Sequence, residues 1–83
     1  MNKIHNLEIY KKISVTDMYK KLDEEVKEVA YAILVNDEEN LAEELLDVIQ
    51  CYYGIAFTKG IKLDECIGKH NMKLLHRSHT FID

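Results

Sequence analysis

The sequence predicts an all-α fold: an antiparallel helical hairpin plus a C-terminal helix, forming a four-helix bundle on dimerisation. Three observations predict this class. The 83-residue chain has no proline and three glycines, alternating strand-like stretches are absent, and apolar residues recur at helical spacing. Residues 1–83 therefore form one small domain, whose own core is modest because small chains bury a low fraction of their surface.

The chain begins with apolar residues at a spacing of three, which predicts a short helix or an irregular arm over the first ~13 residues. The segment Ser14-Val15-Thr16-Asp17 then resembles a capping box that opens a helix. That helix is predicted from about Asp17 to Val35. Its buried stripe is predicted to contain Met18, Leu22, Val26, Val29 and Ile33.

Asn36 and Asp37 end this helix, and one of them can cap the next. The second helix is predicted from about Glu38 to Lys59, with Gly60 as the residue just past its end. Its buried stripe is predicted to contain Leu41, Leu45, Val48, Ile49, Tyr52, Ile55 and Ala56.

A loop from Gly60 to Leu63 is predicted to lead to Asp64, which would cap a third helix from about Glu65 to Arg77. Residues 78–83 are predicted to form a tail. The residues of the third helix expected to point inward are Ile67, Leu74 and either Met72 or Leu75.

Composition excludes several classes of protein. The net charge of −4 does not indicate a nucleic-acid-binding protein, and no apolar run approaches the ~18 residues that span a bilayer. Cys51 and Cys66 lie within helical patterns and are expected to be reduced, buried thiols. Without a signal-peptide pattern, we expect a cytoplasmic protein with neither nucleic acid polymers nor membranes as partners.

Two acidic clusters lie on the two long helices: Glu24, Glu25 and Glu28 on the first, Glu44 and Asp47 on the second. Residues three apart on a helix point the same way, about 60° apart around the axis. Each pair borders the apolar stripe, and the short turn favours an antiparallel hairpin. The last four of these carboxylates can therefore converge along one seam.

Converging carboxylates repel one another and lose hydration unless a cation compensates them. All-oxygen ligands suit a hard cation, which predicts a Mg²⁺ site with Mn²⁺ as an expected substitute. The alternative is a helical interaction or regulatory module whose acids are only a solvated face. A solvated face would mix lysines in at these positions, whereas Lys27 is expected to point away from the Glu25–Glu28 edge.

The pattern EExxE, a gap of fifteen residues and then ExxD resembles the MazG-like all-α nucleoside triphosphate pyrophosphohydrolases. The resemblance covers about Leu22 to Arg77. It implies Mg²⁺-dependent cleavage of a nucleoside triphosphate to the monophosphate and pyrophosphate. It also implies that either Glu24 or Glu25 activates or orients the attacking water. The metal ligands that it implies are Glu25, Glu28, Glu44 and Asp47.

The third helix resembles the C-terminal segment through which members of that family contact phosphates. The residues that the resemblance assigns to the substrate are Lys69, Asn71, Lys73 and Arg77. Many relatives have a glycine after the arginine, where this chain has Ser78, so the match is weaker at Arg77.

The sequence leaves two questions open: which substrate the enzyme cleaves, and how many copies of the chain assemble. A phosphoribosyl-ATP pyrophosphatase of histidine synthesis has a similar fold and related acids, so it is the rival enzyme. Three helices leave one side of the hairpin uncovered, which predicts a homodimer, with further pairing into a tetramer as an option.

Overall fold

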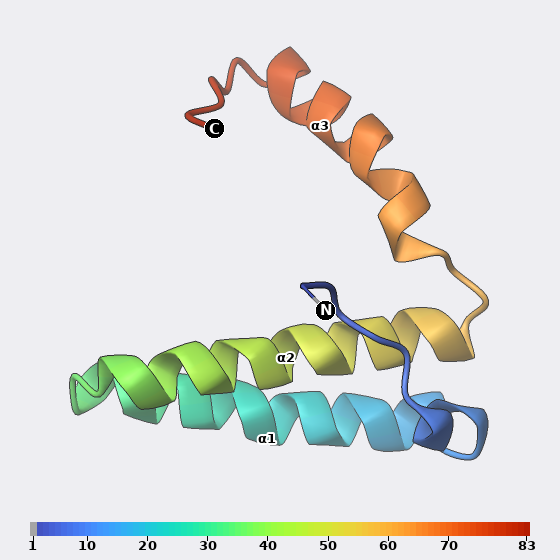
Figure 1. Ribbon diagram of the computed structural model, residues 1–83, viewed down its shortest axis with the longest axis vertical. Helices are drawn as coiled ribbons and strands as arrows, with labels where there is room; N and C mark the ends of the chain where they lie inside the picture. Colours follow the sequence, from blue (N-terminus) through green and yellow to red (C-terminus); the bar gives the residue numbers. More distant parts are fainter. Residues whose placement is uncertain (1) are drawn as a thin grey trace.

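The structure of the protein, a computed structural model, describes residues 2–83, so Met1 of the expected arm lies outside the described residues. The elements in order are η1 (Glu8–Lys11), α1 (Val15–Leu34), α2 (Glu38–Thr58), η2 (Leu63–Cys66) and α3 (Ile67–His76). Residues 2–83 form helices and no strands, which confirms the all-α class (Figure 1).

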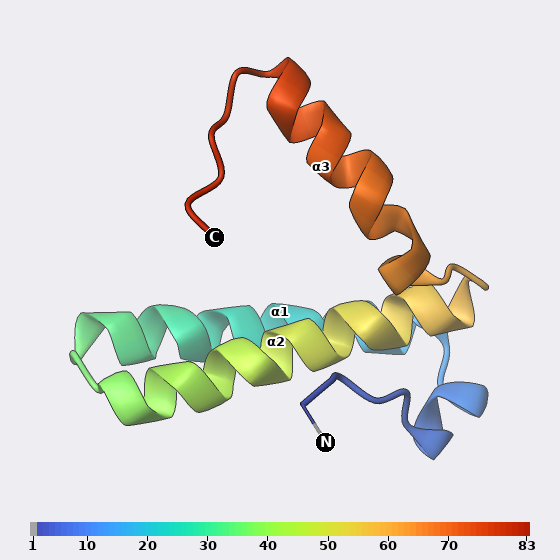
Figure 2. The same cartoon turned by 45° about the horizontal axis from the view of Figure 1, so that its top comes forward.

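Helices α1 and α2 form the predicted antiparallel hairpin and lie side by side along their length in both Figure 1 and Figure 2. Asn36 makes the turn with a φ of 56°, a left-handed conformation that asparagine tolerates better than most residues. The backbone N–H of Asp37 donates to the carbonyl of Ala32, which closes the end of α1. The Asp37 side chain then accepts from the N–H of Asn40, so this residue caps α2 as predicted.

The predicted cap of α1 is confirmed, and the helix begins two residues before the expected start at Asp17. The Ser14 hydroxyl oxygen accepts a hydrogen bond of 3.0 Å from the N–H of Asp17, and the helix begins at Val15. At the end of α2, Gly60 has a φ of 70° and follows the last capping residue, as predicted. Few other residues adopt that conformation without strain.

The predicted cap of the third helix is wrong, and the helix begins two residues after the expected start at Glu65. A 3-10 turn, η2, covers Leu63–Cys66, and α3 begins only at Ile67. Asp64 does not cap α3. Its carboxylate instead accepts a hydrogen bond of 2.6 Å from the hydroxyl of Tyr53 on α2, so this short acid fastens η2 to the hairpin.

The core lies where the N-terminal arm crosses the hairpin. Tyr10 from η1, Met18 from α1 and Cys51 from α2 are buried there. Gly54 makes the close approach possible, because a Cβ at this position would lie 2.6 Å from the Met18 Cε and 2.8 Å from the Tyr10 Cε1. The arm that the sequence left undefined is therefore a structural part of the core.

The predicted buried stripes are only partly correct. Met18 and Ala56 are buried, and five further members are partly buried: Leu22, Val29, Leu41, Val48 and Ile55. Five others are exposed because neither the arm nor α3 covers their side of the hairpin. These corrected residues are Val26, Ile33, Leu45, Ile49 and Tyr52.

Helix α3 stands apart from the middle of the hairpin in Figures 1 and 2 and packs against η2. The predicted inward residues Ile67, Met72 and Leu75 are consequently exposed, and Leu74 is half-buried. Cys66 is exposed as well, which corrects the expectation of a buried thiol, whereas Cys51 is buried. The radius of gyration is 14.9 Å, above the value of about 12 Å for a compact domain of this length.

Over the described residues, no helix combines the length and the apolar character needed to cross a bilayer.

Candidate metal centre

Three carboxylates from two helices meet midway along the hairpin. Glu25 and Glu28 come from α1 and Glu44 from α2, and one oxygen of each lies within 4.8 Å of the others. The helical spacing of the two acids on α1 and the antiparallel packing of α2 bring them together, as the sequence predicted.

Burial makes this cluster unusual for an acidic surface. Glu25 is 6% exposed, although it carries a carboxylate. One of its oxygens, Oε1, lies 3.1 Å from the Lys21 ammonium, and the other, Oε2, is buried without a hydrogen-bond partner. The Oε2 atom of Glu44 is likewise buried and unpartnered. Unpaired buried oxygens of this kind are expensive, because burial removes their hydration.

The electrostatics of the cluster are those of crowded anions. A side-chain hydrogen bond with Glu28, then burial and the charges of Glu28, Asp47 and Glu25, raise the pKa of Glu44 to about 7. The cluster therefore holds a proton near neutrality. A divalent cation would supply the same compensation without the proton.

Asp47 and Glu24 occupy the edges of the site. Asp47 does not belong to the three-carboxylate cluster, but burial and the charges of Glu25, Glu43 and Glu28 raise its pKa. Glu24 is exposed and lines the same cavity as Glu25 and Asp47. The roles assigned to these two residues, metal ligand and water-orienting group, stay predictions.

Lys21 is the site residue that the sequence reasoning missed. It lies one helical turn before Glu25, and its spacing of four residues is the usual one for an ion pair on a helix. That spacing was the available signal. Lys27, in contrast, pairs with Asp23 at 3.1 Å, which confirms that it points away from the Glu25–Glu28 edge.

The basic residues of α3 do not join the acids within one chain. None of the four residues assigned to the substrate lines the cavity beside the acids, and α3 leans away from that part of the hairpin (Figures 1 and 2). The role of these residues in substrate binding therefore stays a prediction: Lys69, Asn71, Lys73 and Arg77.

The donor set fits a hard divalent cation. All three groups of the cluster are carboxylates, and two of their buried oxygens have no other partner. Oxygen ligands without sulfur or imidazole favour Mg²⁺ or Mn²⁺ over Zn²⁺ or copper. These three carboxylates can thus hold a metal ion.

Comparison with known protein families gives one match. The profile described as phosphoribosyl-ATP pyrophosphohydrolase matches residues 3–74, most of the chain, including all five acids. Neither the curated proteins nor the solved structures gave a match.

Proposed function

Because the chain belongs to the phosphoribosyl-ATP pyrophosphohydrolase family within the MazG-like all-α superfamily, we propose that it is a Mg²⁺-dependent nucleotide pyrophosphohydrolase. Membership makes it a hydrolase of acid anhydrides. The proposed reaction converts a nucleoside triphosphate, NTP or dNTP, to the monophosphate and pyrophosphate. Phosphoribosyl-ATP is the second candidate substrate, because it is the one in the description of the matching family. The observation that carries the metal-dependent mechanism is the buried, unpartnered pair of oxygens on Glu25 and Glu44.

The chain's own residues divide the chemistry between them. Glu25, Glu28, Glu44 and Asp47 would hold Mg²⁺, which supplies positive charge to the substrate phosphates when bound. A water oxygen attacks phosphorus, the bond to the pyrophosphate oxygen breaks, and a carboxylate takes the proton of the water. Glu24 is the better candidate for this proton, because Lys21 already engages Oε1 of Glu25.

A pyrophosphate-release assay tests the proposal. Common NTPs and dNTPs and phosphoribosyl-ATP would each be incubated with the protein, with and without Mg²⁺ or Mn²⁺. We expect Glu25→Gln and Glu28→Gln to abolish release while circular dichroism retains the helical signal. Glu39→Gln is the matched control, since this exposed acid lies on α2 outside the cluster. Full activity in both cluster variants would refute the assignment.

The exposed apolar residues of the hairpin support the proposed homodimer. Tyr19, Val26 and Ile33 recur every seven residues on α1, and Leu45, Ile49 and Tyr52 share a face of α2; all six are exposed. No large side chain is fully buried within the described residues. Packing these stripes against a second copy would make a four-helix bundle, with a tetramer as the further option.

Sedimentation at micromolar concentration checks the dimer. We expect the wild-type chain to sediment as a dimer or tetramer, and Ile49→Lys to shift it towards the monomer. Ile82→Lys is the control, because Ile82 is fully exposed in the tail. A monomeric wild-type chain would contradict the proposal.

The basic and amide residues of α3 can reach a substrate at the acids only if α3 moves or a second copy supplies it. We propose that Asn71 and Lys73 contact the phosphates, with Lys69 and Arg77 behind them, after α3 folds back or when a second copy supplies it. Mixing inactive Glu25→Gln chains with Lys73→Ala chains separates these routes. Recovered activity indicates delivery by the second copy, whereas full activity of Lys73→Ala alone would refute its role. A cytoplasmic location and the absence of nucleic acid or membrane partners stay predictions.

A further inference from the structure

A cavity of about 560 Å³ lies between the N-terminal arm and the hairpin, next to the acidic cluster. Glu24, Glu25 and Asp47 form part of its wall, so it is continuous with the candidate metal centre. Its volume falls within the ~300–1,000 Å³ of typical small-molecule sites. A ligand bound at the acids therefore has room to extend under the arm.

The remaining wall differs in chemistry from the acids. Leu7, Ile9 and Ile13 come from the arm and Met18 from α1, with the ring of Tyr10 among them. Apolar and aromatic walls of this kind bind a flat heteroaromatic ring, and Asp17, Lys20 and Gln50, which also line the cavity, can hydrogen-bond to a sugar. A phosphate chain would stay at the acidic end, where a cation can neutralise it.

Hydrogen bonds hold the arm in place over α2. The Tyr10 hydroxyl donates to the carbonyl oxygen of Gln50 at 2.7 Å, and Gln50 Nε2 donates to the Tyr10 hydroxyl and to the carbonyl of His5, both at 2.6 Å. Two acceptors thus fix the orientation of the Gln50 amide. Its Oε1 atom remains as an acceptor in a side chain that lines the cavity.

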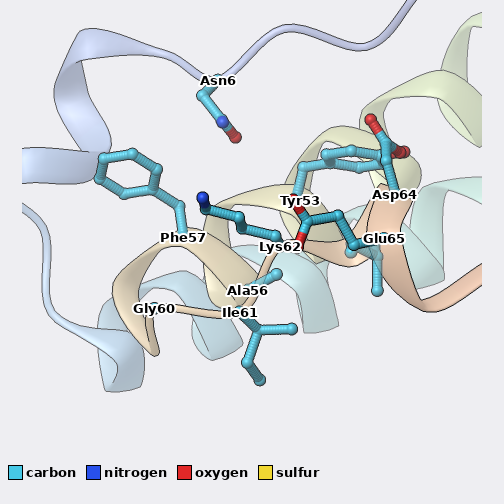
Figure 3. A pocket seen from close by; sticks show the side chains of 10 residues that line it. Asn6, Tyr53, Ala56, Phe57, Gly60, Ile61, Lys62, Asp64 and Glu65 are labelled. Atoms are coloured by element: carbon cyan, nitrogen blue, oxygen red, sulfur yellow. The ribbon is translucent and has the colours of Figure 1, made fainter.

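A second cavity, of about 470 Å³, provides a comparison (Figure 3). It lies between the end of α2 and η2, where Tyr53 and Asp64 are side by side, and it contains none of the acids of the metal centre. Ile61 and Leu63 line it and are about as exposed as Ile9 and Leu7 of the first cavity.

We propose that the cavity under the N-terminal arm binds the nucleoside part of the substrate, base and ribose, while the phosphates lie against the acids. This inference rests on the proposed function for the identity of the substrate. It makes Leu7 and Ile9 contact residues for the base and Gln50 a positioning residue for it. Specificity for the nucleoside then resides in residues 5–13 and Gln50, and cleavage in the hairpin acids.

The test uses nucleosides, which have no phosphates, added to the full-length protein without a divalent cation. Adenosine, guanosine, cytidine and uridine would be titrated while backbone amide shifts are recorded by NMR. We expect at least one nucleoside to shift the amides of Leu7, Ile9 and Gln50. The double variant Leu7→Ala/Ile9→Ala should weaken this binding by about fivefold or more, as expected for lost apolar contact. Ile61→Ala/Leu63→Ala is the matched control and should bind normally.

The outcomes separate this inference from the proposed function. If nucleosides bind under the arm but no substrate releases pyrophosphate, the nucleoside site is supported and the proposed pyrophosphohydrolase function is refuted. Normal hydrolysis, with an unchanged KM in Leu7→Ala/Ile9→Ala, would refute the inference alone. Shifts confined to Tyr53 and Ile61, or no shifts with any nucleoside, would also refute it.

Discussion

The Lys21 ammonium lies 3.1 Å from Oε1 of Glu25, while Oε2 of the same buried carboxylate has no partner. One oxygen of Glu25 is therefore paired within α1, while the residue also belongs to the cluster with Glu28 and Glu44. The ion pair gives the most buried acid of the cluster one cationic partner within the chain.

Replacing Lys21 by methionine should have opposite effects on the metal-free and metal-bound protein. The metal-free protein should lose about 1 kcal/mol of stability, the upper end for a half-exposed ion pair. Mg²⁺ should raise the Tm of the variant more than that of the wild type, because no ammonium competes for Glu25. Thermal denaturation without Mg²⁺ measures the loss of stability, and the same experiment with Mg²⁺ measures the rise in Tm. Lys27→Met, which breaks the exposed pair with Asp23, should change neither.

The stability of the metal-free protein should fall as pH rises from about 4.5 to about 7. The pKa of Glu44 is raised from 4.5 to about 7 in the folded chain, so the folded state holds a proton that the unfolded state releases in this window. Below it both states are protonated, and above it both are ionised. Denaturation across this pH range should show the decline, and Glu44→Gln should flatten it. A rise in stability over the same window would contradict this protonation.

Tyr10→Phe should destabilise the protein by about 1–2 kcal/mol, because it removes a hydroxyl that both donates to and accepts from Gln50 in a partly buried place. Urea denaturation measures the loss. Tyr53→Phe also removes a hydrogen bond, but to the exposed Asp64, and should cost clearly less than Tyr10→Phe. Equal losses would show that the arm is not anchored through Tyr10.

Two glycine substitutions should act in opposite directions. Gly54→Ala places a Cβ against the Tyr10 ring and Met18 and should cost about 1–3 kcal/mol through overpacking. Gly68→Ala meets nothing within 4 Å on α3 and should gain about 0.5–1 kcal/mol from helix propensity. Chemical denaturation of both variants compares them. A stabilising Gly54→Ala would show that the arm does not pack closely at this point.

The sequence predicted the hairpin and its acids because local signals determine both. Ser14 and Asp37 cap the long helices, Asn36 and Gly60 end them, and the ExxE and ExxD spacings determine which carboxylates share a face. Each of these signals acts within about one turn of helix. Family resemblance added the chemistry that spacing alone does not specify.

Longer-range features escaped prediction for a physical reason. The arm is held by Tyr10 and Gln50, forty residues apart, and by the space that Gly54 leaves. Nothing in the local pattern links these positions. The exposure of Ile33 and Tyr52 was also missed, because a helical stripe indicates an apolar face and does not identify the molecule that covers it.

The short connection between α1 and α2 limits how the carboxylate cluster can open. Three residues, 35–37, join the helices, and the helices cannot separate without disrupting the packing of Met18 and Cys51. An ion entering the proposed centre would therefore have to pass by rotation of individual carboxylates, while the hairpin backbone keeps its place.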